Sequence, residues 1–165
     1  MVQGVGVRLP TVFGPAAAPT ADDHGVVSAM VRRALADVPL TLWGSGGVHR
    51  DLLFVEDAAR AVVAAADHAD VLAGRHWLVG TWRPTRLSDL FAAVAVAAVA
   101  AAVAEESGRP PVPVVRVDPP DGAAATDTHS FTVDPSRFHR ATGWVPQVSL
   151  DEGLRRTVSF LTGRA

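Results

Sequence analysis

Short apolar runs alternate with longer amphipathic segments along this chain. Residues 4–9 form an apolar, β-branched run that Pro10 ends, which predicts a buried strand that enters a loop. Four further segments have the same character and predict strands: residues 40–43, 51–55, 76–80 and 112–117. Glycines at 44, 46 and 47 predict a turn between the first two of these four segments.

The longer segments carry helix signals. Residues 26–37 follow Asp22 and Asp23, which are plausible caps, and precede Pro39. Glu56 and Asp57 place negative charge at the start of a helix that runs to about residue 68. Further helices are predicted over an Ala-rich stretch after residues 85–89, over 135–142 and over 149–161. Because strands and helices alternate, the sequence predicts an α/β fold.

Length and composition limit the possible functions. The 165 residues suit a single domain, residues 1–165, with a sizeable core. The 15 basic residues are balanced by 17 acidic ones, so the chain has no basic stripe for nucleic acid. There is no cysteine, which excludes disulfides and thiolate metal sites and is compatible with a reducing cytoplasm.

No targeting or membrane signal is apparent in the sequence. The longest apolar stretch, residues 90–104, is shorter than the roughly 20 residues that a membrane-spanning helix needs. The N-terminus lacks the charged start and long apolar core of a signal peptide. We therefore expect a cytoplasmic protein that does not enter a membrane.

Arg50 is the strongest ligand candidate. A guanidinium beside a flexible glycine turn can form two hydrogen bonds to phosphate oxygens, and backbone N–H groups of the turn could add to them. The alternative is a surface hairpin in which Arg50 only pairs with Asp51. The glycines do not form the G-x-G-x-x-G pattern between a strand and a helix that binds dinucleotides.

Other candidate residues carry weaker signals. Asp57 could orient a substrate, although a carboxylate at this position is more often a helix cap. Ser45 lacks the G-x-S-x-G context of a nucleophile, and the six histidines show no metal-binding spacing. Trp43, next to the glycine turn, is a core residue or could stack on a base or sugar.

The order of three motifs resembles that of extended short-chain dehydrogenases/reductases of the NAD-dependent epimerase/dehydratase family. RLPTVFGP is similar to R-x-x-N-V-Y-G-P, and GSGGVHRDLLFVEDAARAV resembles G-x-G-x-x-x-R-D-x-x-x-V-x-D-x-x-x-A-x. TGWVPQVSLDEGL resembles the closing T-G-W-x-P and L-x-E-G-L pattern. Within the family, the chain looks most similar to ketoreductases that reduce the C4 ketone of a TDP-4-keto-6-deoxyhexose.

The resemblance implies roles for individual residues. Arg50 matches the arginine that binds the nucleotide diphosphate, and Thr11 replaces an Asn that contacts the sugar or its phosphates. Pro39, Leu40 and Leu42 match the stretch that lines the nucleotide base. His129 and Ser130 stand where relatives often place a second arginine on the diphosphate.

The resemblance covers only the C-terminal portion of the family's Rossmann-type fold. The implied cofactor, NAD or NADP, binds to an N-terminal half that carries G-x-x-G-x-x-G, which is absent from this chain. The family's proton donor is the Tyr of Y-x-x-x-K, and this chain contains neither Tyr nor Lys. Residues 4–9 and 76–80 are then expected to be strands of the missing half's sheet.

These observations lead to one main hypothesis and two alternatives. The main hypothesis is the nucleotide-sugar-binding portion of a TDP-4-keto-6-deoxyhexose 4-ketoreductase, which by itself is inactive. The expected partners are a TDP-sugar and either a complementary N-terminal half or a second copy of the chain. The alternatives are a fragment of a nucleotide-sugar epimerase or 4,6-dehydratase, and a non-catalytic nucleotide-sugar-binding remnant.

Overall fold

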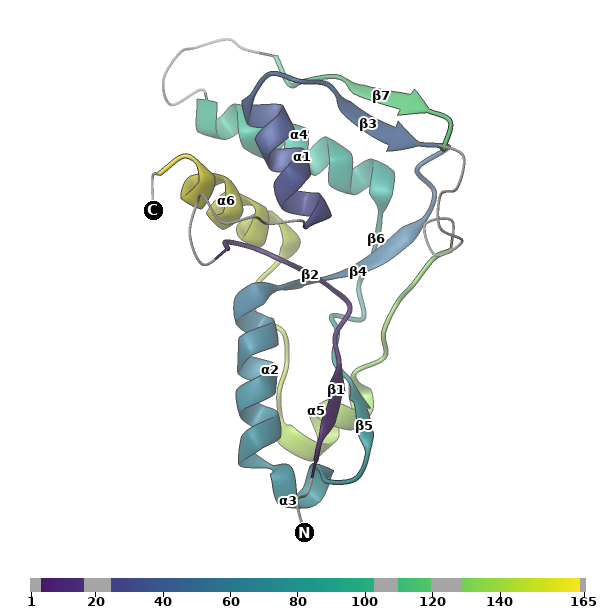
Figure 1. Ribbon diagram of the computed structural model, residues 1–165, viewed down its shortest axis with the longest axis vertical. Helices are drawn as coiled ribbons and strands as arrows, with labels where there is room; N and C mark the ends of the chain where they lie inside the picture. Colours follow the sequence, from purple (N-terminus) through teal and green to yellow (C-terminus); the bar gives the residue numbers. More distant parts are fainter. Residues whose placement is uncertain (1–3, 17–24, 103–109, 120–128, 164–165) are drawn as a thin grey trace.

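The computed structural model describes residues 4–16, 25–102, 110–119 and 129–163. Figure 1 shows an elongated molecule in which one group of elements lies above a central strand layer and another lies below it. The strands form three small sheets, with the orders β1-β5, β2-β4-β6 and β3-β7. Helices pack on these sheets, so the predicted α/β class is confirmed.

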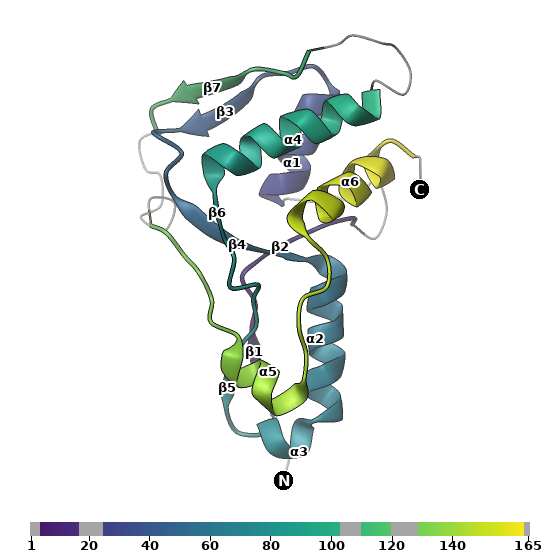
Figure 2. The ribbon, with the colours of Figure 1, turned by 180° about the vertical axis from the view of Figure 1, so that it is seen from behind.

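The upper group consists of three helices and a two-stranded sheet. Helix α4 (Leu87–Ala102) packs against α1 (Val26–Leu35) and α6 (Leu150–Leu161). Strands β3 (Leu40–Trp43) and β7 (Val114–Val117) are parallel and lie beside these helices (Figure 2). Buried apolar side chains from these elements form the larger hydrophobic core.

The lower group contains a parallel strand pair that helices cover on one side. Strands β1 (Gly6–Arg8) and β5 (His76–Leu78) pair in parallel, with Val7 opposite Trp77. The helices are α2 (Val55–Asp67), the short α3 (Ala69–Leu72) and α5 (Ser136–Thr142). Trp77, Phe138 and Trp144 are among the buried residues of the second core, and their rings meet edge to face.

The middle sheet joins the two groups. Strand β4 (His49–Phe54) is parallel to β2 (Thr11–Phe13) on one side and antiparallel to β6 (Pro84–Arg86) on the other. Successive side chains of a strand point to opposite faces. Leu52 of β4 therefore joins the larger core, and Leu53 joins the second core. Both cores depend on this one strand.

The structure confirms strands within residues 4–9, 40–43, 51–55, 76–80 and 112–117, and helices at most of the predicted places. Residues 4–9 and 76–80 pair with each other, while their membership of a larger sheet stays a prediction. The Asp22 and Asp23 caps lie outside the described residues, and Gly25 occupies the N-cap position of α1. Helix α6 is capped by Ser149, whose side chain accepts a hydrogen bond from the Glu152 backbone.

Three elements were not predicted. Strand β2 follows Pro10 at once, although the sequence predicts a loop there. Proline has no backbone N–H to donate, so it interrupts one ladder, and the chain then enters a different sheet. Strand β6 is only three residues long and takes its conformation from pairing with β4. The four-residue helix α3 is too short for a periodic pattern.

Candidate functional site

Strand β4 places Arg50 and Asp51 on opposite faces of the middle sheet. Arg50 lies opposite Thr85 of β6 in the antiparallel register, and its side chain is half-buried. Asp51 is fully buried. The surface hairpin in which Arg50 only pairs with Asp51 is therefore wrong, because the Asp51 carboxylate does not lie on the surface.

The Arg50 guanidinium is held by two backbone carbonyl groups. Its Nη1 donates to the carbonyl oxygen of His129 at 2.6 Å and to that of His49 at 3.0 Å. Arg50 and His129 lie 79 positions apart in the sequence, and both are candidate phosphate ligands. The structure thus brings these two predicted site residues together, although through the His129 main chain.

Residues 129–131 run alongside the start of β4. The His49 backbone N–H donates to Ser130 Oγ at 3.1 Å, and the Phe131 backbone N–H donates to the His49 carbonyl at 3.0 Å. Arg86 of β6 lies opposite His49 in the register. We call His49, Arg50, His129 and Ser130 the Arg50 cluster. The Arg50 guanidinium can bind phosphate oxygens, whereas the His49 imidazole points to the opposite face of β4, as Asp51 does.

The glycine turn has a structural role. Gly44 and Gly46 have φ angles of +60° and +68°, which non-glycine residues rarely adopt. The Gly44 N–H donates to Val117, and the Gly47 N–H donates to Ser45 Oγ. These two donors are already used within the chain.

The structure places the remaining predicted ligands in different surroundings. Thr11 begins β2 opposite Leu52, so it shares the sheet face of Arg50 on the neighbouring strand. Leu40 and Leu42 are 1% and 2% exposed and belong to the larger core. Pro39 is exposed, and its carbonyl accepts a hydrogen bond from Arg33. The proposed roles of these residues in base or sugar binding stay predictions.

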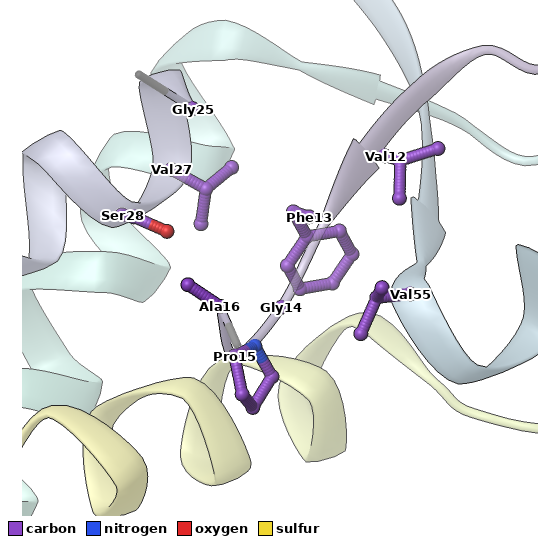
Figure 3. A pocket seen from close by; sticks show the side chains of 9 residues that line it. All are labelled: Val12, Phe13, Gly14, Pro15, Ala16, Gly25, Val27, Ser28 and Val55. Atoms are coloured by element: carbon purple, nitrogen blue, oxygen red, sulfur yellow. The ribbon is translucent and has the colours of Figure 1, made fainter. Parts of the chain in front are cut away.

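A small apolar pocket of about 180 Å³ lies between the end of β2 and the start of α1 (Figure 3). Among its described lining residues, only Ser28 has a polar side chain. Arg50 does not line it. The pocket therefore lacks the charge that a diphosphate requires.

A second hollow of about 180 Å³ adjoins the Arg50 face of β4, although Arg50 is not among its lining residues. It is lined by Leu52, the next residue on the Arg50 face of β4, and by Thr85, the cross-strand neighbour of Arg50. The other polar side chains in its wall belong to Thr81, Arg83, Gln147 and Ser149. A hydroxyl- and amide-lined hollow beside a cationic cluster suits a polar ligand better than the apolar pocket does.

Asp57 does not cap its own helix. Its carboxylate binds other segments of the chain and not Arg50. Phe54 occupies the N-cap position of α2, without a side-chain hydrogen bond. The Asp57 carboxylate is fully buried, accepts from the backbones of Gln147 and Val148, and pairs with Arg60. The helix-cap interpretation is therefore wrong.

Sequence reasoning missed the role of Asp51. Alternation along β4 could have predicted that Asp51 is buried, because successive strand residues point to opposite faces and Arg50 is the accessible neighbour. The contacts of His49 and Ser130 had no local signal, because they join segments 81 positions apart.

The described part of the chain shows no grouping of three or more His, Cys, Asp or Glu residues that could hold a metal ion. No helix among these residues is long and apolar enough to cross a membrane. The glycine turn joins two strands, β3 and β4, and its Gly44 and Gly47 N–H groups are already used. This turn therefore does not fit the pyrophosphate of a dinucleotide cofactor, which binds between a strand and a helix.

Comparison with known proteins agrees with the motif order. Residues 1–80 match the model of the NAD dependent epimerase/dehydratase family. The chain is 31% identical to a UDP-glucose 4-epimerase of Mycolicibacterium smegmatis and 28% identical to a dTDP-glucose 4,6-dehydratase of Neisseria gonorrhoeae. Each alignment covers 93% of this chain and 44% of the relative. The chain thus spans less than half the length of these relatives.

Solved structures give the same result. A UDP-glucose 4-epimerase of Thermotoga maritima, solved with UDP-glucose, has a TM-score of 0.73 at 26% identity. The alignment covers 95% of this chain and 45% of the epimerase chain. The Thermus thermophilus UDP-glucose 4-epimerase in complex with NAD has a TM-score of 0.69 at 30% identity, covering 96% and 46%. The Rossmann-like fold is confirmed, and NAD or NADP is consistent with the family. The family model and these relatives thus show that the chain is similar to proteins of the NAD-dependent epimerase/dehydratase family.

Proposed function

We propose that this chain binds the nucleotide sugar of an NAD(P)-dependent TDP-4-keto-6-deoxyhexose 4-ketoreductase. The observation that carries the proposal is the Arg50 cluster, in which two carbonyl groups fix a guanidinium near the start of β4. A planar guanidinium held in one orientation suits the paired oxygens of a diphosphate. The motif resemblance to the 4-ketoreductases supports a TDP-4-keto-6-deoxyhexose as the substrate.

In this proposal, the hollow beside Arg50 receives the polar end of the nucleotide sugar. Its wall includes Thr85, opposite Arg50, and Gln147 and Ser149 from the segment before α6. These hydroxyl and amide groups can donate to and accept from sugar hydroxyls. Thr11, on the same sheet face as Arg50, offers a further hydroxyl.

The chemistry requires a second polypeptide segment. The chain has neither the Tyr nor the Lys of the family's proton donor, and its glycine turn does not fit a dinucleotide. A complementary N-terminal half therefore supplies the nicotinamide cofactor and the proton donor. The isolated chain is expected to bind its ligand without turnover.

A nucleotide-sugar epimerase or 4,6-dehydratase is the second candidate. It is favoured by the names of the relatives, which include a UDP-glucose 4-epimerase and a dTDP-glucose 4,6-dehydratase. Product analysis of the chain joined to a complementary N-terminal half separates the candidates. Only the ketoreductase consumes reduced cofactor stoichiometrically with the sugar.

The binding proposal is tested by calorimetric titration of the purified chain with TDP. Arg50→Ala removes the guanidinium and is expected to weaken binding by roughly 10- to 100-fold, as for a lost charged hydrogen bond. Arg75→Ala, at an exposed turn far from β4 in the sequence, serves as the charge-matched control. If neither the chain nor its complex with the N-terminal half binds TDP or a TDP-sugar, the proposal is wrong.

A further inference from the structure

We infer that Asp51 is a positioning residue for Arg50. Its buried carboxylate holds residues 129–133 against β4, so that the His129 carbonyl stays where it orients the Arg50 guanidinium. The inference rests on the proposed role of Arg50 in binding the diphosphate. Asp51 itself points to the other face of the sheet and does not touch the ligand.

The Asp51 carboxylate collects donors from two separate segments. From the turn after β5 it accepts the backbone N–H groups of Thr81 and Trp82, at 3.0 and 3.3 Å, and the Thr81 hydroxyl at 2.5 Å. From the segment that follows the Arg50 cluster it accepts the Val133 N–H at 3.2 Å. One side chain therefore ties β4 to both neighbouring segments.

Close packing at Gly80 makes this junction possible. A Cβ atom added to Gly80 would lie 2.7 Å from Asp51 Oδ2 and 2.8 Å from Val133 Cβ. Real Cβ atoms do not approach other atoms so closely, and both neighbours are buried. A side chain at position 80 would have to push Val133 away from Asp51.

The junction requires an acceptor-only group. An ionised carboxylate has about four lone-pair sites, and here the donors are three N–H groups and one hydroxyl. An Asn amide would turn an NH2 group toward some of these donors and leave them unpaired. Asp51→Asn therefore changes the hydrogen bonding while it keeps the shape.

A continuous hydrogen-bonded path connects this junction to Arg50. Val133 is anchored by Asp51, Phe131 donates to the His49 carbonyl, and His129 accepts from Arg50 Nη1. These three contacts lie at alternate residues of one short segment. Loss of the Val133 anchor releases the end of the segment, and the guanidinium then loses a fixed acceptor.

The test compares two buried carboxylates. Asp51→Asn is expected to weaken TDP binding by about tenfold. Gly80→Ala and Thr81→Val should also weaken it, since they disturb the same junction without changing its charge. Asp57→Asn is the matched control, because Asp57 is also fully buried but anchors Gln147 and Val148, which line the hollow proposed for the sugar that TDP lacks. It should leave TDP affinity within about twofold of the wild type.

A double-mutant cycle separates positioning from general destabilisation. Arg50→Lys keeps the charge but loses the planar fork. If Asp51 acts through Arg50, Asp51→Asn should have little further effect in that background. An equal loss of affinity in both backgrounds, unchanged affinity in Asp51→Asn, or an equal loss in Asp57→Asn would overturn the inference.

A measurement without ligand distinguishes this inference from the proposed function. Asp51→Asn should increase amide hydrogen exchange at Phe131 and speed the rotation of the Arg50 guanidinium, as followed by NMR. If these changes occur while the wild type binds no TDP, the diphosphate role of Arg50 is wrong and the positioning of Arg50 by Asp51 stands. If neither property changes, Asp51 does not position Arg50.

Discussion

Asp57 Oδ2 accepts a hydrogen bond from the Val148 backbone nitrogen at 3.0 Å. The first turn of α2 thereby holds the segment that leads into α6, and Oδ1 accepts the Gln147 N–H at 2.8 Å. The Trp144 indole also donates to the Asp57 carbonyl. A fully buried carboxylate thus joins the C-terminal segment to the middle of the molecule.

Asp57→Ala is expected to lower the free energy of unfolding by about 3 kcal/mol, because it leaves two buried N–H groups without an acceptor and removes a partner of Arg60. Urea unfolding followed by circular dichroism measures the change. Glu56→Ala, at the exposed neighbouring position, is the control and should change stability by less than about 1 kcal/mol. Equal effects of the two substitutions would contradict this role of Asp57.

The two αL glycines of the turn should respond differently to alanine. At Gly44, an added Cβ meets open space, so Gly44→Ala costs only the backbone strain, about 1 kcal/mol. At Gly46, the Cβ would lie 2.5 Å from Leu42 Cδ2, and Gly46→Ala should cost about 1–3 kcal/mol more. Thermal unfolding of both variants tests this order. If Gly44→Ala is the more destabilising, packing of the turn against Leu42 is not the deciding factor.

Trp82→Gly is expected to stabilise the protein. Trp82 has a φ of +56° and is 60% exposed, so the bulky residue adopts an unfavourable conformation with little burial. Its backbone N–H still donates to Asp51 when glycine replaces the side chain. We expect the free energy of unfolding, measured by chemical denaturation, to rise by about 1 kcal/mol from the relieved strain. The entropy that glycine adds to the unfolded chain reduces this gain. Trp82→Ala keeps a Cβ and should show no comparable gain.

The ion pairs of α6 predict a pH-dependent contribution to stability. The hydrogen bond from Arg156 lowers the pKa of Glu152 below its ordinary value of 4.5, and Arg155 adds to the effect. A lowered folded-state pKa favours folding above the ordinary value, and this contribution is lost as the pH falls through the folded-state pKa. The difference in free energy of unfolding between the wild type and Glu152→Gln should therefore reach its full value near pH 7 and disappear in acid.

This difference should also shrink in 1 M NaCl, because the pair is exposed and salt screens it. Unfolding curves at several pH values and at low and high salt test both effects. A difference that persists at pH 2 would show that Glu152 contributes by packing and not by charge.

The β1-β5 pair predicts association through its uncovered face. Trp77 of β5 is buried against the second core, whereas Leu78, on the opposite face, is 46% exposed. Parallel sheets are normally covered on both faces, so we expect the chain to self-associate or to bind a complementary half there. Leu78→Lys should reduce self-association in size-exclusion chromatography with light scattering. Val71→Lys, on α3, is an equally exposed control, and a monodisperse wild-type monomer would contradict the prediction.

Local signals in the sequence were enough to predict most elements and the main candidate ligand. Hydrophobic periodicity, caps and glycines are local signals, and they located α1, α2, α6 and most strands to within a few residues. Arg50 was evident because a glycine turn and an Arg-Asp pair occur together. The resemblance implied that Leu40 and Leu42 line the nucleotide base, but the alternation of β3 turns both into the core.

Which groups meet depends on the packing of segments that lie far apart in the sequence. The contact of Arg50 with the His129 carbonyl spans 79 positions, and that of Asp51 with Val133 spans 82. Such contacts depend on how β4 pairs and on which segments pack beside it, and no local pattern encodes them. For the same reason, adjacent residues with opposite charges, Arg50 and Asp51, act on opposite faces of one strand. Alternation along β4 directs Asp51 toward the interior and Arg50 toward the face where we propose that the diphosphate binds.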